Sequence, residues 1–451
     1  MVQPSNLLFR AYQRTVHSLA FYPTLIALGF LLLCLLNIAI EYQPWLLVLK
    51  ARLDIGLVKN ADNARLILGT LVAGIMSLMV FSFSMVMVVL NNAAAALSPR
   101  VIPGLISSKG HQKTLGFYLG TILYALLLIT TIEQQGDERV PSLGVLVTLG
   151  LGIACLGLFV QFIRSISQSI QVEYILNNLY CTTLDKLGGC ERKLLDCRQP
   201  PRWPVAAGWA QVEARRSGYF KELNVVTLNA LLEEHDLRMA VLVHRGFFVM
   251  AGHPLFKLDR PVDEALQQQL LDCFDFFVEQ YASSHYVFGC KHISEIAVKA
   301  LSPGINDPGT ALTAIDMLCV LFSKRMALPD LDVMPLADQA PRLFFLELPL
   351  DQLLQLVFGP LRTYGGADPQ VLSGLLQAYK NLLYQQPSAR HKADLVRHAQ
   401  SVLETADRHI ANRRDREELN AMVERFNQAA GATPPALAPL KMEAAPGDNA
   451  P

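Results

Sequence analysis

Residues 66–90 read LILGTLVAGIMSLMVFSFSMVMVVL and contain no Asp, Glu, Lys or Arg. An α-helix rises about 1.5 Å per residue, so about 20 apolar residues are enough to cross the hydrocarbon core of a bilayer. Because lipid tails offer no hydrogen bonds to a peptide backbone, a stretch that crosses this core alone has to be helical. Residues 66–90 therefore predict a membrane-spanning helix, and they set the fold class of the chain.

Three further apolar stretches accompany this one, over residues 19–40, 114–132 and 140–163. The first is too long for the apolar part of a cleaved signal peptide, and no small-residue cleavage site follows it. Four such stretches within residues 1–165 favour membrane spans over buried helices of a large soluble core. The composition agrees with this interpretation, because the chain of 451 residues is 52% apolar and only 17% charged.

The rest of the chain has the composition of a soluble domain. We expect a helical stalk over 166–189, a small β-rich module over 203–258, a helical domain over 259–428 and a disordered Pro/Ala-rich tail over 429–451. The predicted fold class is thus a four-helix α transmembrane region followed by a mixed α/β, mainly helical, soluble C-terminal domain. The net charge of zero gives no sign of a nucleic-acid partner, so the bilayer is the expected one.

Several element boundaries within the soluble part follow from local patterns. Residues 212–223 read as one strand, residues 263–282 as one helix and residues 342–348 as a short strand. Gly188 and Gly189 are expected to end the stalk, because consecutive glycines weaken a helix.

The topology follows from the number of spans and from the cysteines. Four spans place both termini on one side of the membrane, but lysines and arginines are almost equally distributed between the two sides. The eight cysteines form no CxxC pair, which is typical of reduced thiols in a reducing compartment. We therefore expect cytoplasmic N- and C-termini.

A polar stripe marks the second span. Ser77, Ser84 and Asn91 are spaced seven residues apart and so share one helix face. The simpler interpretation is that they pack against another helix of the same chain, such as the third span. The sharper interpretation is that they line a polar pathway between several copies of the chain.

Small residues recur in the third and fourth spans. Gly116 and Gly120 form a GxxxG pattern, and Gly150, Ala154 and Gly157 follow a similar spacing. Both patterns are typical of helices whose backbones approach closely, so we expect them to make helix contacts.

One loop in the soluble domain is a candidate ligand site. It reads Ser302-Pro-Gly-Ile-Asn-Asp-Pro308, and Ser302, Asn306, Asp307 and Thr310 offer oxygen atoms beside a predicted helix start. A helix start can bind an anion. However, Asp307 as N-cap and Pro308 as the first helical residue explain the same pattern as a structural turn, which we favour.

Three segments together resemble one bacterial family. They are FSFSMVMVVLNNAAAALSPRVI (81–102), FIRSISQSIQV (162–172) and ISEIAVKALSPGINDPGTALTAIDML (293–318). They are similar to the predicted four-span membrane proteins of domain-of-unknown-function family 2254. The resemblance implies a multi-pass protein of the bacterial plasma (inner) membrane with a cytoplasmic C-terminal domain, and it implies no activity.

Two classes of function remain open. In the first, the chain forms a homo-oligomeric channel or transport-like protein whose second span lines a pathway gated by the cytosolic domain. In the second, the spans anchor a soluble domain that binds a ligand or a partner protein. No catalytic or nucleotide-binding motif and no metal-ligand spacing occurs, so we expect no enzyme, no cofactor and no metal site.

Overall fold

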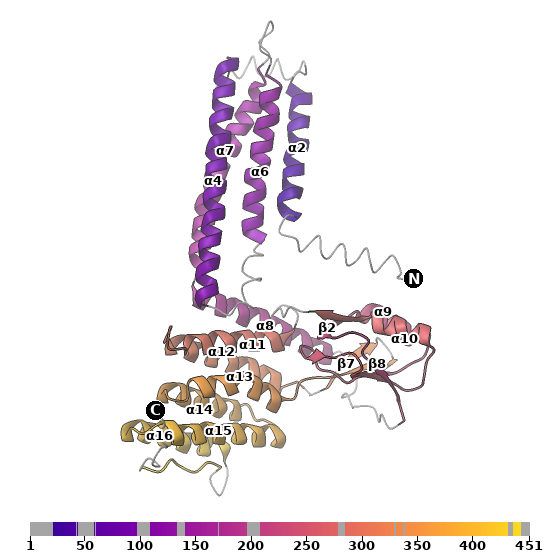
Figure 1. Ribbon diagram of the computed structural model, residues 1–451, viewed down its shortest axis with the longest axis vertical. Helices are drawn as coiled ribbons and strands as arrows, with labels where there is room; N and C mark the ends of the chain where they lie inside the picture. The colour runs from indigo at the N-terminus through magenta and orange to yellow at the C-terminus, as the bar shows by residue number, and fades with distance from the viewer. Residues whose placement is uncertain are drawn as a thin grey trace. The chain divides into compact units, whose positions relative to one another are not determined.

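The computed structural model of the chain is shown in Figure 1. It describes residues 21–41, 43, 58, 60–96, 109–132, 140–169, 171–195, 208–277, 285–328, 331–336, 339–431 and 436–442. The chain divides into two compact units, one formed by residues 1–95 and 102–171 and the other by residues 96–101 and 172–451. We call them the membrane unit and the soluble unit.

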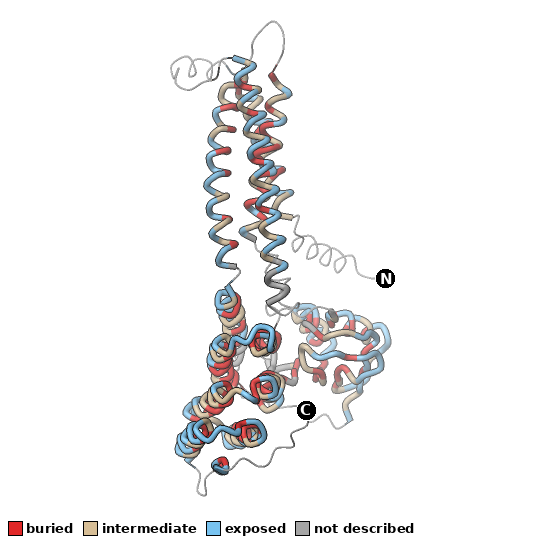
Figure 2. The backbone as a smooth tube through the Cα atoms, turned by 60° about the vertical axis from the view of Figure 1, so that its left-hand side comes forward, coloured by how far each residue is buried: buried red, intermediate tan, exposed pale blue. Residues whose placement is uncertain are grey.

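The membrane unit contains four long apolar helices. They are α2 (Phe21–Glu41), α4 (Ala61–Ala96), α6 (Lys109–Thr130) and α7 (Ser142–Ser169). Each is long and apolar enough to cross a bilayer, which confirms the predicted membrane fold class. Much of their surface is exposed within a single chain (Figure 2), as expected for helices that contact lipid.

Close packing of α2 on α6 confirms one of the small-residue patterns. A Cβ atom added at Gly116 would lie 2.9 Å from the Pro23 Cα atom, and one added at Gly120 would lie 2.7 Å from the Phe30 Cγ atom. Both positions therefore accept only glycine without movement of α2. The GxxxG pattern brings these two backbones together.

The pattern in α7 behaves differently. Gly150, Ala154 and Gly157 are exposed, and no atom lies within 4 Å of a Cβ added at either glycine. Among the described residues of one chain, the expected helix contact is therefore not found at these two glycines. Two other α7 glycines do approach another helix, Gly144 near Leu128 and Gly152 near Leu71.

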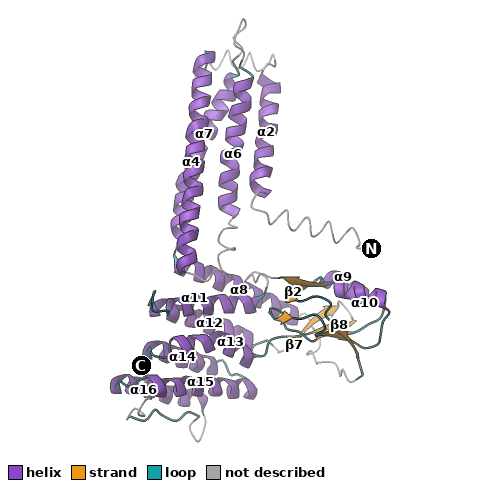
Figure 3. Cartoon of the chain, viewed as in Figure 1, coloured by secondary structure: helices purple, strands orange, loops and turns teal. Residues whose placement is uncertain are grey.

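The helices of the soluble unit form a stack (Figures 1 and 3). They are α8 (Val172–Leu195), α11 (Tyr286–Ala300), α12 (Pro308–Met326), α13 (Leu350–Tyr364), α14 (Pro369–Leu383), α15 (Ala389–His409) and α16 (Arg413–Ala430). Helix α8 packs on α11 and α12, α13 packs on α11, and α15 packs on α13. In the same way α14 packs on α12, and α16 packs on α14. Packing of each helix on the one two places earlier is typical of α-helical solenoids.

The soluble unit also contains two β-sheets. The strands are β1 (Ala210–Glu213), β2 (Gly218–Leu223), β3 (Met239–Val241), β4 (Phe248–Val249), β5 (Pro254–Leu258), β6 (Phe274–Phe277), β7 (Leu331–Leu336) and β8 (Gln339–Leu346), with helices α9 (Val225–Glu234) and α10 (Glu264–Asp272) between them. The strand orders are β1-β5-β3-β8-β7 and β4-β2-β6. Only the β3–β8 pair is parallel among the described strands.

Several expected boundaries need correction. Residues 212–223 form two strands, β1 and β2, joined by a turn, and residues 263–282 begin as α10 but continue as β6. Phe274 and Phe276 alternate along β6 and both contact Phe220 of β2, so packing of aromatic rings on one sheet face outweighs the helical pattern. Strands β6, β7 and β8 thus extend the β-rich part beyond residues 203–258.

Two further boundaries differ around α8. The fourth span continues to Ser169 and α8 begins at Val172, so the stalk expected over 166–189 is divided between two helices. Helix α8 also continues past Gly188 and Gly189 to Leu195. Its contacts with α11 and α12 explain this, because tertiary packing commonly outweighs the cost of about 1 kcal/mol for each glycine in a helix.

Candidate functional site

The polar stripe of α4 points away from the rest of the membrane unit. Ser77, Ser84 and Asn91 are all exposed. The residues of α4 that are buried between Ala61 and Val89 are Ala64, Leu68, Ile75 and Ser82. Since successive helical residues are rotated by about 100°, the two sets lie on nearly opposite faces of α4. The stripe therefore does not pack on α6, and the simpler interpretation of the sequence fails within one chain.

Several threonine hydroxyl groups in the spans donate to a carbonyl of their own helix. Thr70, Thr121 and Thr148 each donate to the carbonyl four residues earlier, at 2.7, 2.8 and 2.8 Å. The hydroxyl groups of Ser77 and Ser84 form no such bond, and they form no hydrogen bond with another described residue. Because lipid tails offer no partner, water or another protein copy is the natural neighbour of this face.

The loop at residues 302–310 is a capped turn. Asp307 accepts a hydrogen bond from the Thr310 backbone N–H at 3.1 Å and another from the Thr310 hydroxyl at 2.6 Å. The hydrogen bonds from Thr310 lower the pKa of Asp307. Ser302 donates to the Lys299 carbonyl at 2.6 Å, and Asn306 adopts a left-handed backbone with φ of 49°. Most polar groups of the loop thus serve the turn itself, as N-capping predicts.

A site that sequence patterns did not reveal lies on α16. Asn420 donates to the Leu440 carbonyl at 3.0 Å and accepts from the Leu440 N–H at 2.7 Å. Asn427 forms the same pair of bonds with Leu437, both at 2.9 Å. A fifth bond of 2.6 Å runs from the Arg416 guanidinium to the Lys441 carbonyl. We call Arg416, Asn420 and Asn427 the α16 clamp.

The α16 clamp corrects the expectation of a disordered tail over 429–451 for residues 436–442, whereas residues 432–435 and 443–451 lie outside the described residues. Helix α16 extends to Ala430, and residues 436–442 are held on its surface, with Leu437 and Leu440 buried. Their Pro/Ala-rich composition misled the sequence interpretation, because two leucines and two asparagine amides outweigh it. The signal was present as Asn420 and Asn427 seven residues apart.

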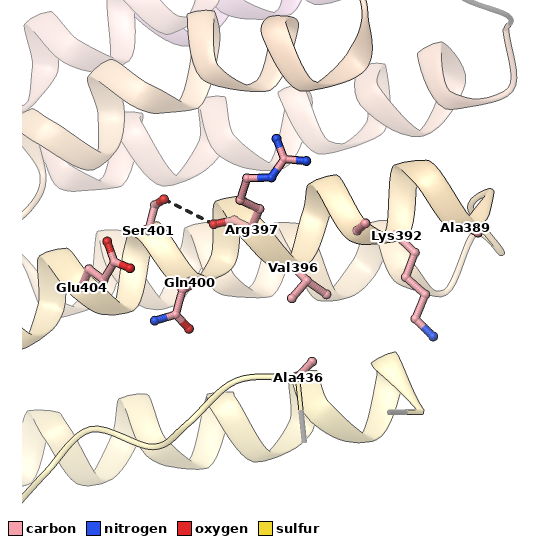
Figure 4. Close-up of a pocket in the computed structure, with 9 residues that line it drawn as sticks. Ala389, Lys392, Val396, Arg397, Gln400, Ser401, Glu404 and Ala436 are labelled. Carbon is pink, nitrogen blue, oxygen red and sulfur yellow. Dashed lines mark hydrogen bonds between the residues drawn. The ribbon is translucent and has the colours of Figure 1, made fainter. Parts of the chain in front are cut away.

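An open hollow continues from this segment along α15 (Figure 4). It is lined by Ala389, Lys392, Ala393, Val396, Arg397, Gln400, Ser401 and Glu404 of α15 and by Ala436. Ala436 lies across from Val396 and Gln400 in this view. The hollow thus joins α15 to the start of the segment held by α16.

A buried polar cluster connects α11, α12 and the chain after β8. The Tyr286 hydroxyl donates to Glu347 at 2.8 Å and accepts from the Arg325 Nε at 3.0 Å. The His285 Nε2 lies 3.7 Å from the same carboxylate. Burial alone would raise the pKa of Glu347, but His285 and Arg245, together with the bond from Tyr286, hold it well below its ordinary value. The hydrogen bonds among these buried groups join α11, α12 and the chain after β8.

No group of three or more His, Cys, Asp or Glu side chains that could hold a metal ion occurs among the described residues. Four of the cysteines in the described soluble unit are free, and Cys273, Cys290 and Cys319 among them are buried. Burial raises the pKa of the Cys319 thiol to about 11, which keeps it protonated and unreactive at neutral pH.

Comparison with known protein families identifies the family of the chain. The family model described as "Predicted membrane protein (DUF2254)" matches residues 16–381. The chain therefore belongs to this family of predicted membrane proteins, and the resemblance noted in the sequence is confirmed. The match ends within α14, so α15, α16 and the segment at 436–442 lie beyond it.

The names of the individual relatives state no activity. "Uncharacterized protein Rv1290c" of Mycobacterium tuberculosis is 25% identical over 353 residues, which cover 74% of this chain and 66% of that protein. "Uncharacterized protein Mb1321c" of Mycobacterium bovis has the same identity and coverage. The matched part is thus just under two thirds of the length of these relatives. No solved structure matches the chain.

Proposed function

We propose that the protein is a homo-oligomeric channel or transport-like protein in which α4 faces of neighbouring copies line a polar pathway. The observation that carries this proposal is the outward orientation of Ser77, Ser84 and Asn91. Three polar side chains on one face of a membrane helix need water or a hydrogen-bonding neighbour. A shared pathway between copies supplies both.

The exposed small residues of α7 also support assembly. Gly150, Ala154 and Gly157 leave a shallow face on which a second backbone can approach closely, as small residues do at helix interfaces in membranes. Within one chain this face has no neighbour near its glycines. A second copy is the simplest occupant.

The soluble unit acts in this proposal as a gate on the cytoplasmic side of a bacterial plasma membrane. Helix α7 ends at Ser169 and helix α8 begins at Val172. A movement of α8 is therefore transmitted to α7 through a very short connection. The proposal includes no catalysis. A reporter fused after Lys186 tests the cytoplasmic placement of the soluble unit.

Disulfide cross-linking tests the assembly. In a chain whose eight native cysteines are replaced by serine, Ser84→Cys should give cross-linked dimers in lipid vesicles on mild oxidation. Phe83→Cys is the matched control, because Phe83 is also exposed, at 58%, but lies about 100° away around α4. Equal cross-linking at both positions, or none at Ser84→Cys, would contradict the proposal.

A second candidate function is a membrane-anchored domain that binds a partner protein. The α16 clamp favours it, because helix side chains there hold an extended segment by its backbone. This candidate needs no pathway along α4. Equal cross-linking through Phe83→Cys and Ser84→Cys would favour this partner-binding candidate over the channel.

A further inference from the structure

We infer that the outer face of α16 is a peptide-binding site and that the chain's own residues 437–441 are its tethered ligand. This inference does not depend on the α4 pathway, and it gives the partner-binding candidate a defined ligand chemistry. It rests on how the backbone, the spacing and the leucines of the segment match the helix.

The backbone is recognised without regard to side chains. Each asparagine amide of the α16 clamp both donates to the carbonyl and accepts from the N–H of one residue, Leu440 for Asn420 and Leu437 for Asn427. These are the bonds that a neighbouring β-strand would make with an added peptide. An extended chain is therefore held without a sheet.

The spacing of the helix fits an extended peptide. Seven residues from Asn420 to Asn427 advance about 10 Å along a helix. Three residues from Leu437 to Leu440 advance about 9 Å in a polyproline-type chain. Pro439 favours such a conformation at Ala438, because a residue before proline is pushed out of the helical region. The segment runs antiparallel to α16, with Arg416 bonded to the Lys441 carbonyl at its far end.

The leucines supply the side-chain specificity. Leu437 is 1% exposed and Leu440 is 7% exposed, whereas Ala438, Pro439 and Lys441 are exposed. A chain with three residues per turn places the two leucines on the same side. The ligand chemistry is therefore an extended Leu-x-Pro-Leu peptide.

Two observations make the segment a ligand rather than another layer of the stack. It forms no helix or strand of its own, and Arg416, Asn420 and Asn427 of α16 bond to its backbone through their side chains. At Ala436 the segment also borders an open hollow along α15 (Figure 4). A tether gives the segment an effective concentration of about millimolar, which keeps a free peptide out at micromolar concentration.

The test is binding of a fluorescein-labelled peptide of residues 434–442 to the full chain in detergent. A receptor with Leu437→Asp and Leu440→Asp should release its own tail and bind the free peptide. The wild-type chain should bind the peptide at least tenfold more weakly. A receptor that also carries Asn420→Leu and Asn427→Leu should again bind at least tenfold more weakly than the one that keeps both asparagines. Replacing exposed Glu424 and Gln428 by alanine instead is the matched control and should leave binding unchanged.

Three outcomes would overturn the inference. The first is no binding by the receptor with an undocked tail while α15 and α16 remain folded, as judged by hydrogen exchange. The second is loss of the α15 and α16 helices in that receptor, which would make the segment a fixed part of the fold. The third is binding of the free peptide to the wild-type chain on dilution, which would assign the occupant to a second copy. None of these outcomes bears on cross-linking through α4.

Discussion

Helices α4 and α16 carry polar residues at the same spacing but meet opposite surroundings. On α4, Ser77 and Ser84 are seven residues apart and point away from the chain, without a partner among the described residues. On α16, Asn420 and Asn427 are also seven residues apart, and each holds one residue of residues 436–442 by two hydrogen bonds. Heptad spacing thus places polar residues on one helix face, whereas only the fold shows whether their partner lies inside the chain.

The buried cluster around Glu347 is the extreme case of a polar group whose partners all lie in the chain. Glu347→Leu should lower the free energy of unfolding by about 3–5 kcal/mol, because buried His285 would lose its carboxylate and the buried Tyr286 hydroxyl would lose its acceptor. The measurement is thermal or chemical unfolding of the full chain in detergent. Glu418→Ala, at a side chain that is 68% exposed, is the control and should change stability by less than about 0.5 kcal/mol. An equally small effect at Glu347 would show that its bonds contribute little.

Loss of the two asparagines of the α16 clamp should have the next largest effect on stability. Asn420→Leu together with Asn427→Leu removes four hydrogen bonds, each with a net contribution of about 0.5–1.5 kcal/mol. We expect the local free energy of opening at Leu437 and Leu440 to fall by about 2 kcal/mol or more. Amide hydrogen exchange measures it directly. Unchanged protection of these two amides would mean that the clamp does not hold the segment.

A single cap should have a smaller effect. Asp307→Ala should destabilise the soluble unit by about 1 kcal/mol through loss of the α12 N-cap, and Asp307→Ser should restore most of it. Because hydrogen bonds from Thr310 lower the pKa of Asp307, the contribution is present at neutral pH and is lost as the pH falls through that lowered pKa. The wild-type and Asp307→Ala chains should therefore converge in acid. If Asp307→Ser folds normally but abolishes a cellular phenotype, the loop is a functional site.

Sequence patterns predicted the features that depend on neighbours along the chain. The four spans, the cap at Asp307 and the close approach at Gly116 and Gly120 follow from hydrophobicity, local hydrogen bonding and side-chain size. Features that depend on distant partners were missed. Phe274 reads as helical until Phe220 is brought beside it, and a Pro/Ala-rich tail reads as disordered until α16 offers its asparagines.

The outward stripe on α4 should have the smallest effect on the fold. Replacing Ser77 and Ser84 by alanine and Asn91 by leucine removes no hydrogen bond between described residues. The free energy of unfolding of the single chain should therefore change by less than about 0.5 kcal/mol, as for other exposed positions. Thermal unfolding in detergent checks this expectation. A larger loss of stability would mean that the stripe has a partner within the chain, and the comparison with α16 would no longer hold.

The most direct measurement is solute flux through purified protein in liposomes. The account predicts that the wild-type protein passes ions or small solutes down a gradient. The variant with Ser77→Ala, Ser84→Ala and Asn91→Leu should remain folded and assembled but pass none, because its pathway would be apolar. Absence of flux through the wild-type protein under every gradient tested, or equal flux through the variant, would contradict the claim that the α4 stripe lines a pathway between copies.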